Sequence, residues 1–79
     1  MLERDISVLD VRTVVDRGDT IEVYPADVPF PSRLVLGWPE GRPLHVVAAD
    51  DPNSEITAVI TVYQPDPELW EPDFRRRRL

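Results

Sequence analysis

The side chain best suited to chemistry in this sequence is His45, the only histidine among 79 residues. An imidazole titrates near neutral pH, so it can act as a general acid or base. His45 lies within the apolar run Arg42–Ala49, which reads as a central strand. The alternative is a strand histidine whose ring is satisfied by a neighbouring side chain or by water. Because no serine or cysteine motif accompanies it, we favour this second interpretation.

Two arginines, Arg33 and Arg42, are candidates for holding a phosphate group, because a guanidinium pairs readily with anions. The expected strands place Arg33 at the beginning of one strand and Arg42 in the turn before the next. Residues at opposite ends of one hairpin do not easily form a single clamp, so each arginine would act separately. Salt bridges to the abundant aspartates and glutamates are the alternative, and we favour them.

No metal or other cofactor is predicted. The chain has no cysteine and a single histidine, a poor basis for a structural metal site. Asp50 and Asp51, or Asp66 and Glu68, would suit a hard cation, but their spacing matches no calcium-binding loop. In an acidic protein such carboxylates more often stabilise turns and helix starts, and we expect that role here.

The composition gives RNA binding little support. The net charge is −6, and subtracting the four positive charges of Arg75–Arg78 leaves a body of −10. Such a body suits phosphate-backbone binding poorly, so RNA would have to contact the arginine run or a local arginine cluster. That run is otherwise a solvated tail or a contact for an acidic partner. Trp38, Trp70 and Phe30 could stack on bases, but we favour core or interface positions for them.

The length predicts one domain with a small core. A core of this size supplies about 3–5 kcal/mol, so small domains often need a staple, a metal or a partner. With no disulfide available, self-association is the expected additional source of stability. No apolar run approaches the ~20 residues that cross a bilayer, and Met1–Asp5 lacks the apolar core of a signal peptide. We therefore expect a cytoplasmic protein without membrane contact.

The hydrophobic periodicity predicts an α+β fold, in which one helix packs on a four-stranded antiparallel meander. The helix is expected over about residues 8–17, with Ser7 as its N-cap, Asp10 completing an approximate capping box and Gly18 at its end. The strands are expected at about 20–24, 33–38, 43–49 and 55–63. A loop with three prolines separates the first two strands, and a turn containing Gly41 joins the next two.

The C-terminal part is expected to add a short helical turn near residues 67–71, which Asp66 would cap. Three large apolar residues of this stretch should dock on the sheet or on a second subunit: Leu69, Trp70 and Phe74. We expect residues 1–74 to form a single α+β domain and residues 75–79 to form an exposed, mobile basic tail.

Four segments carry a family resemblance. They are Tyr-Pro-Ala-Asp (24–27), Pro-Ser-Arg-Leu-Val-Leu-Gly (31–37), Gly-Arg-Pro-Leu-His-Val-Val (41–47) and Ile-Thr-Val-Tyr-Gln-Pro-Asp (60–66). These segments resemble a bacterial domain family of unknown function. Its members look distantly like RelE/ParE-type and BrnT-like toxins of toxin–antitoxin pairs. The likeness extends from about residue 4 to residue 70, and the Pro-Leu-His-Val-Val block is its most specific part.

The resemblance implies helices against a curved antiparallel sheet and a link to RNA cleavage. Family members usually begin with a strand and a helix that carry a His-Ala…Arg-Met block, whereas this chain starts at the end of that block. His45 matches the second histidine of the family, and the first is expected to be missing. Loss of that segment would bare a strand edge and apolar surface, so we expect a homodimer or higher oligomer.

Two functions from different classes follow. The first, which we favour, is a non-catalytic, self-associating protein-binding module related to these toxins, with a protein partner such as an antitoxin. The second is a toxin-like, metal-independent endoribonuclease. In that case His45 would act as acid or base, and Arg33 or Arg42 would steady the phosphate. We do not expect catalysis from this chain.

Overall fold

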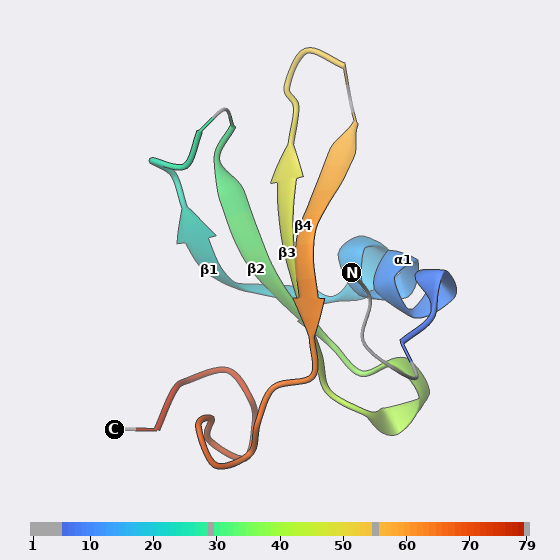
Figure 1. Cartoon of the computed structure of the whole chain (residues 1–79), viewed down its shortest axis with the longest axis vertical. Coiled ribbons are helices and arrows are strands. Elements are labelled where there is room, and N and C mark those ends of the chain that lie inside the picture. Colours follow the sequence, from blue (N-terminus) through green and yellow to red (C-terminus); the bar gives the residue numbers. More distant parts are fainter. Residues whose placement is uncertain (1–5, 29, 55, 79) are drawn as a thin grey trace.

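A computed structural model describes residues 6–28, 30–54 and 56–78, and it shows one α-helix against an antiparallel sheet (Figure 1). The elements follow in the order α1 (Val8–Arg17), β1 (Asp19–Tyr24), β2 (Ser32–Gly37), the 3-10 turn η1 (Pro39–Gly41), β3 (Leu44–Asp50) and β4 (Thr57–Tyr63). The strands pair in sequence order, β1-β2-β3-β4, and every pair is antiparallel. The predicted α+β meander is therefore confirmed.

The ends of α1 are those that the sequence predicts. The Ser7 hydroxyl accepts a hydrogen bond from the N–H of Asp10 at 3.1 Å, and the Asp10 carboxylate accepts one from the N–H of Ser7 at 3.5 Å. These two bonds form a capping box. At the other end, the N–H of Gly18 donates to the Val14 carbonyl at 2.7 Å. A Cβ at Gly18 would lie 2.6 Å from the Leu36 carbonyl oxygen, so this close turn into β1 requires glycine.

The strand boundaries differ from the predicted ones by a residue or two. β1 begins at Asp19, and β3 continues to Asp50. The first residue predicted for β4, Glu55, lies outside the described residues. A bulge in the β3–β4 pairing leaves Ile60 without a partner on β3. Local patterning sets where the strands run, whereas their ends and bulges depend on the pairing with neighbouring strands.

The main hydrophobic core lies between α1 and one face of the sheet. Successive strand side chains point to opposite faces, and Val35, Val46 and Val62 place their side chains on the α1 side of three adjacent strands. They pack with Val14, which is almost fully buried. Gly37 allows this close approach, because a Cβ there would meet Val14 Cγ2 at 2.6 Å. The helix therefore covers β2 and β3 more than it covers β4.

The opposite face of the sheet carries residues 65–78, which we call the strap. Figure 1 shows α1 and the strap on opposite sides of β4. A row of paired residues, Leu36, His45 and Tyr63, crosses β2, β3 and β4 on the strap side. Trp70 of the strap is only 4% exposed and packs on His45. The predicted docking of Trp70 on the sheet is confirmed, whereas Leu69 stays exposed.

The strap begins with the predicted turn. The Asp66 carboxylate accepts from the N–H of Glu68 at 2.8 Å, and its carbonyl accepts from the N–H groups of Leu69 and Trp70 at 2.9 and 3.1 Å. This is a single hydrogen-bonded turn with Asp66 as its cap, and the chain then turns back on itself. The returning backbone pairs with the turn, because the N–H of Arg78 donates to the Leu69 carbonyl at 2.8 Å.

The arginine run is exposed, as expected, but it does not extend freely from the domain. Arg75 pairs with Asp19 on β1, and Arg77 lies 5.4 Å from the centre of the Trp70 ring. Arg78 donates to the Pro67 carbonyl at 2.9 Å. The division expected between residues 74 and 75 stays a prediction, and Leu79 lies outside the described residues.

Within the described residues, no helix has the length and apolar character needed to cross a membrane. The expectation about a leader peptide rests on Met1–Asp5, and these residues lie outside the described part of the chain.

Candidate functional site

His45 is fully buried in the middle of the sheet, and both of its ring nitrogens are engaged. Nε2 lies 2.9 Å from the carbonyl oxygen of Phe74 in the strap, and Nδ1 lies 3.1 Å from the hydroxyl of Tyr63 on β4. The imidazole ring also stands edge-on to the ring of Trp70, with centroids 4.4 Å apart. His45 therefore joins the central strand β3 to the strap.

The partners of His45 define its protonation state. A carbonyl oxygen can only accept, so Nε2 carries the proton, and Nδ1 of the neutral ring accepts from the Tyr63 hydroxyl. Burial lowers the pKa of His45 below its usual 6.5, against the smaller opposing effects of the Phe74 carbonyl and of Glu22. The ring is neutral at pH 7, and neither nitrogen is open to a substrate. This geometry supports the satisfied strand histidine, and the catalytic role stays a prediction.

Arg33 lies at the start of β2 and pairs with the end of β3. Its Nε donates to the carboxylate of Asp50 at 3.1 Å. The same carboxylate accepts from the Thr57 hydroxyl at 2.6 Å, and these two contacts, Thr57 before Arg33, lower the pKa of Asp50. Asp50 at the end of β3 is therefore linked to Arg33 of β2 and to Thr57 of β4. The salt bridge that we favoured for Arg33 is confirmed.

Arg42 follows η1 at the other end of the β2–β3 hairpin, beside Pro43 and Leu44. The turn that holds it is tight: Glu40 has φ 56° and Gly41 has φ 80°. Gly41 adopts the left-handed conformation that the sequence predicts for it. Arg42 is half-buried and has interactions of its own within the protein.

The fold does not bring the three predicted site residues together. Arg33 pairs with Ala48 on β3, whereas Arg42 follows the turn beyond the Gly37–Leu44 pair. Four residues of strand separate Arg33 from Gly37, which is about 13 Å at the usual rise of a strand. Arg33 and Val35 lie on the α1 face, and His45 lies on the strap face. As predicted, the two arginines form no single clamp, and Arg33 does not share a face of the sheet with His45.

Three of the carboxylates that would suit a hard cation, Asp50, Asp51 and Asp66, have partners within the protein. Asp51 accepts from the N–H of Asn53 and the hydroxyl of Ser54, at 2.8 and 2.7 Å, and these bonds lower its pKa. Asp66 caps the turn at the start of the strap. Across residues 6–28, 30–54 and 56–78, histidine and carboxylate side chains form no group of three that could hold a metal ion. The turn and cap roles expected from the sequence are confirmed for Asp51 and Asp66, whereas Asp50 pairs with Arg33 and Thr57.

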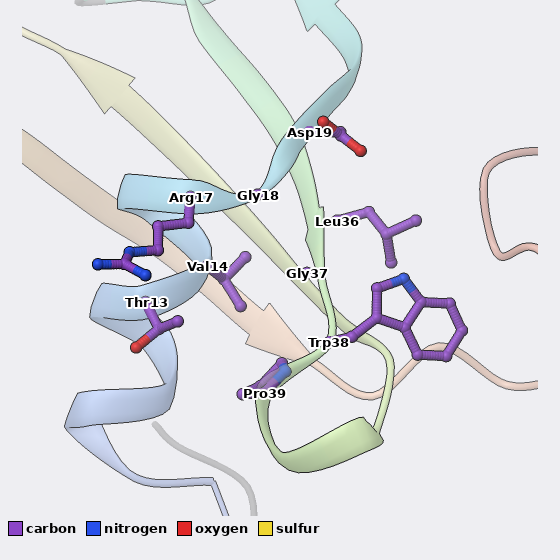
Figure 2. Close-up of a pocket in the computed structure, with 9 residues that line it drawn as sticks. All are labelled: Thr13, Val14, Arg17, Gly18, Asp19, Leu36, Gly37, Trp38 and Pro39. Carbon is purple, nitrogen blue, oxygen red and sulfur yellow. The ribbon is translucent and has the colours of Figure 1, made fainter.

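The pocket between α1 and β2 does not gather chemical groups either. A pocket of about 250 Å³ lies where the end of α1 meets the end of β2. Figure 2 shows Arg17 pointing away from Trp38, with Val14, Gly18 and Gly37 between them. The side chains with polar ends diverge around this pocket, whereas a binding site needs them to converge. Gly18 and Gly37, which let α1 lie close to β2, line this pocket.

The aromatic residues that could stack on bases are dispersed. Trp70 is buried under the sheet row, while Trp38, half exposed, contacts the ring of Phe74 edge-on with centroids 5.7 Å apart. Phe30 precedes β2, at the opposite end of that strand from Trp38. The core or interface positions that we favoured therefore hold for Trp70, and no shared platform includes Phe30 and Trp38.

Sequence reasoning missed the residues that complete the surroundings of His45. Tyr63 was placed in a strand without a role, and Phe74 contributes its backbone carbonyl, which any residue type could supply. Sequence patterns did not locate Tyr63, because its alignment with His45 depends on the β3–β4 register, which contains a bulge. No signal could have located the Phe74 carbonyl, which lies 29 residues from His45 in the sequence.

The protein is a small α+β domain with one helix on a four-stranded meander, and its central histidine is buried. The chain belongs to the family described as domain of unknown function DUF4258, which matches residues 1–64. The predicted membership of a family of unknown function is confirmed, whereas the likeness to toxins stays a prediction. No curated protein and no solved structure matches the chain. The strap, residues 65–78, lies beyond the matched region.

Proposed function

We propose that this chain is a non-catalytic protein-binding module that associates with a second copy of itself. The observation that carries the proposal is an apolar groove between α1 and β4, of about 340 Å³. Three valines of α1 and one of β4 line it: Val8, Val11, Val15 and Val59. Val8 is 70% exposed. Clustered apolar side chains of this kind mark interaction surfaces.

The position of the groove favours association. β4 ends the sheet, so its outer edge has backbone groups without a strand partner among the described residues. Because α1 covers β2 and β3, the α1 face of β4 is left partly bare. A second chain that fills the groove would bury this face and add to the small core.

The charges beside the groove fit a second copy. Arg12 and Asp16 lie four residues apart on α1 and both line the groove. If two copies pack about a two-fold axis with their α1 helices antiparallel, Arg12 of each lies opposite Asp16 of the partner subunit. Self-complementarity of this kind is what a two-fold interface requires. The apolar lining and these two charges therefore support a second copy as the occupant of the groove.

The toxin relationship is the finer part of the proposal. It rests on the resemblance to RelE/ParE-type and BrnT-like toxins, with an antitoxin as the class of protein partner. The alternative is an endoribonuclease of that kind, which relies on His45 matching a family histidine. The occupied ring nitrogens and the separation of His45 from Arg33 and Arg42 favour the non-catalytic module.

Light scattering after size exclusion tests the association. We expect the wild type to elute at micromolar concentration with twice the 9.1 kDa mass of one chain. Val8→Glu should shift it to the mass of one chain, because a charge would enter the groove. Arg12→Asp should do the same, and Arg12→Asp combined with Asp16→Arg should restore the dimer. Val23→Glu is the matched control, since Val23 is 62% exposed on the opposite edge strand.

Two results would contradict the proposal. If the wild type has the mass of one chain at all concentrations, the chain does not self-associate. If Val8→Glu and Val23→Glu change the mass equally, the groove is not the interface. A separate RNA-cleavage assay of the wild type and of His45→Gln tests the ribonuclease alternative. Cleavage by the wild type that is lost in His45→Gln would establish catalysis.

A further inference from the structure

The strap is held to the rest of the chain by few contacts, and His45 is at their centre. Trp70 packs on the His45 ring and the Phe74 carbonyl accepts from it, while the Phe74 ring stands edge-on to Trp38 and Pro65 is buried. The ion pair between Arg75 and Asp19 is exposed on both sides, and exposed pairs contribute little. The contacts of Arg77 and Arg78 lie within the strap itself.

The site around His45 suits only the neutral ring. With Nε2 donating to Phe74, Nδ1 must accept from the Tyr63 hydroxyl. A protonated ring would present a second N–H to that hydroxyl, which would then have to turn its own proton elsewhere. Neither ring nitrogen contacts a carboxylate in the part of the chain that the structure describes. A buried positive charge without such a partner is costly.

We propose that His45 is a pH-sensitive latch, and that its protonation releases the strap from the sheet. Release would uncover Trp70 and the row formed by Leu36, His45 and Tyr63 on β2, β3 and β4. This second surface lies on the opposite face of the sheet from Val59, which lines the groove between α1 and β4.

The charged and titratable groups around His45 come from three elements. Tyr63 on β4 contacts Nδ1, Glu22 on β1 favours the protonated ring from a distance, and Arg77 of the strap acts on Tyr63. The Phe74 carbonyl also favours the protonated ring. Burial outweighs these effects and lowers the pKa of His45 in the closed strap. On release, the ring is solvated and its pKa returns towards about 6.5.

The sign of the effect follows from this difference. The open form binds a proton more readily than the closed form, so the closed strap is fully stabilised above about pH 6.5. Its stability falls as the pH drops below that value and levels off below the pKa of the closed form. Each unit of difference between the two pKa values changes the ratio of open to closed strap about tenfold.

Tryptophan fluorescence tests the latch. The chain has two tryptophans, so Trp38→Phe leaves Trp70 as the single reporter. Between pH 8 and pH 5 we expect the Trp70 emission to shift to the red and its quenching by acrylamide to increase. Amide hydrogen exchange of β2 and β3 should stay slow over this range, because the sheet and α1 remain folded. In the same background, His45→Gln keeps a donor for the Phe74 carbonyl but does not titrate, so the pH dependence should disappear.

Several results would overturn the latch. These are Trp70 emission that does not change between pH 8 and pH 5, a His45→Gln variant with the same pH dependence, and loss of β2–β3 protection at the same pH as the Trp70 change. If His45→Gln does not fold, nuclear magnetic resonance of the wild type tests the latch instead. The imidazole signals of His45 and the indole N–H of Trp70 should then change with one midpoint, and a His45 titration without a Trp70 change contradicts the proposal.

Discussion

At the residue scale, the contact between Gly37 and Val14 sets how closely α1 lies on the sheet. Gly37 is on the α1 face of β2, and Val14 is among the most deeply buried side chains of the protein. An ideal Cβ at position 37 would lie 2.6 Å from Val14 Cγ2 and 3.1 Å from Val14 Cβ. These distances leave no room for a methyl group, so glycine is required here for space.

Gly37→Ala is therefore expected to lower the free energy of unfolding by about 1–3 kcal/mol, the usual cost of overpacking a core. Urea denaturation followed by circular dichroism measures the loss. Val14→Ala removes the methyl groups that the new Cβ would meet, so the double variant should be less destabilised than the sum of the two single variants. Additive effects of the two substitutions would show that position 37 does not press on Val14.

At the scale of elements, α1 depends on its N-terminal cap and on packing more than on intrinsic propensity. Of its ten residues, Val11 and Val14 belong to the buried core and Val15 packs against it, and all three are β-branched. Such residues favour the helix only weakly. The capping box of Ser7 and Asp10 satisfies backbone donors that would otherwise lack partners. This local device explains why the helix could be located from the sequence.

Ser7→Ala should lower the free energy of unfolding by about 1 kcal/mol, because the N–H of Asp10 loses its acceptor. Thr13→Ala is the matched control: it also removes an exposed hydroxyl from α1, one that donates to the Leu9 carbonyl, but it leaves the cap intact. We expect the control to stay within about 0.5 kcal/mol of the wild type. Equal losses in the two variants, measured by thermal unfolding, would argue against the capping box.

For the whole molecule, negative charge and two tyrosines determine the behaviour at alkaline pH. The net charge is already −6 at pH 7. Burial, followed by the hydrogen bond to Glu22, raises the pKa of Tyr24 to about 12. Burial also raises the pKa of Tyr63. Because both pKa values are raised, the folded state holds the two phenol protons more tightly than the unfolded state does.

We therefore expect the protein to keep its full tyrosine-linked stability below about pH 10, the pKa of an unfolded tyrosine. As the pH rises from there towards 12, the unfolded state loses its protons first, and the free energy of unfolding should fall. Urea midpoints at pH 8, 9.5 and 11 measure the slope. Tyr24→Phe should reduce it, leaving the part due to Tyr63. A slope unchanged in Tyr24→Phe would exclude Tyr24 as its source.

The sequence by itself determined the elements and their order. The helix over residues 8–17 has the predicted ends, because Ser7, Asp10 and Gly18 act within one turn of the helix termini. The four strands also follow from short local patterns, and their meander needs only hairpin connections. Bulges and exact ends escaped prediction, because they depend on the register between strands.

Only the tertiary structure decided what His45 does. Its partners Tyr63 and Phe74 are 18 and 29 residues away, and the ion pair between Arg75 and Asp19 spans 56 residues. Composition and spacing carry no information about such contacts, because chain reversal brings them together after the elements have formed. From the sequence, an isolated histidine on an apolar strand favours packing but leaves catalysis open. The folded strap favours packing, since the Phe74 carbonyl engages Nε2 of the ring, and the catalytic role stays a prediction.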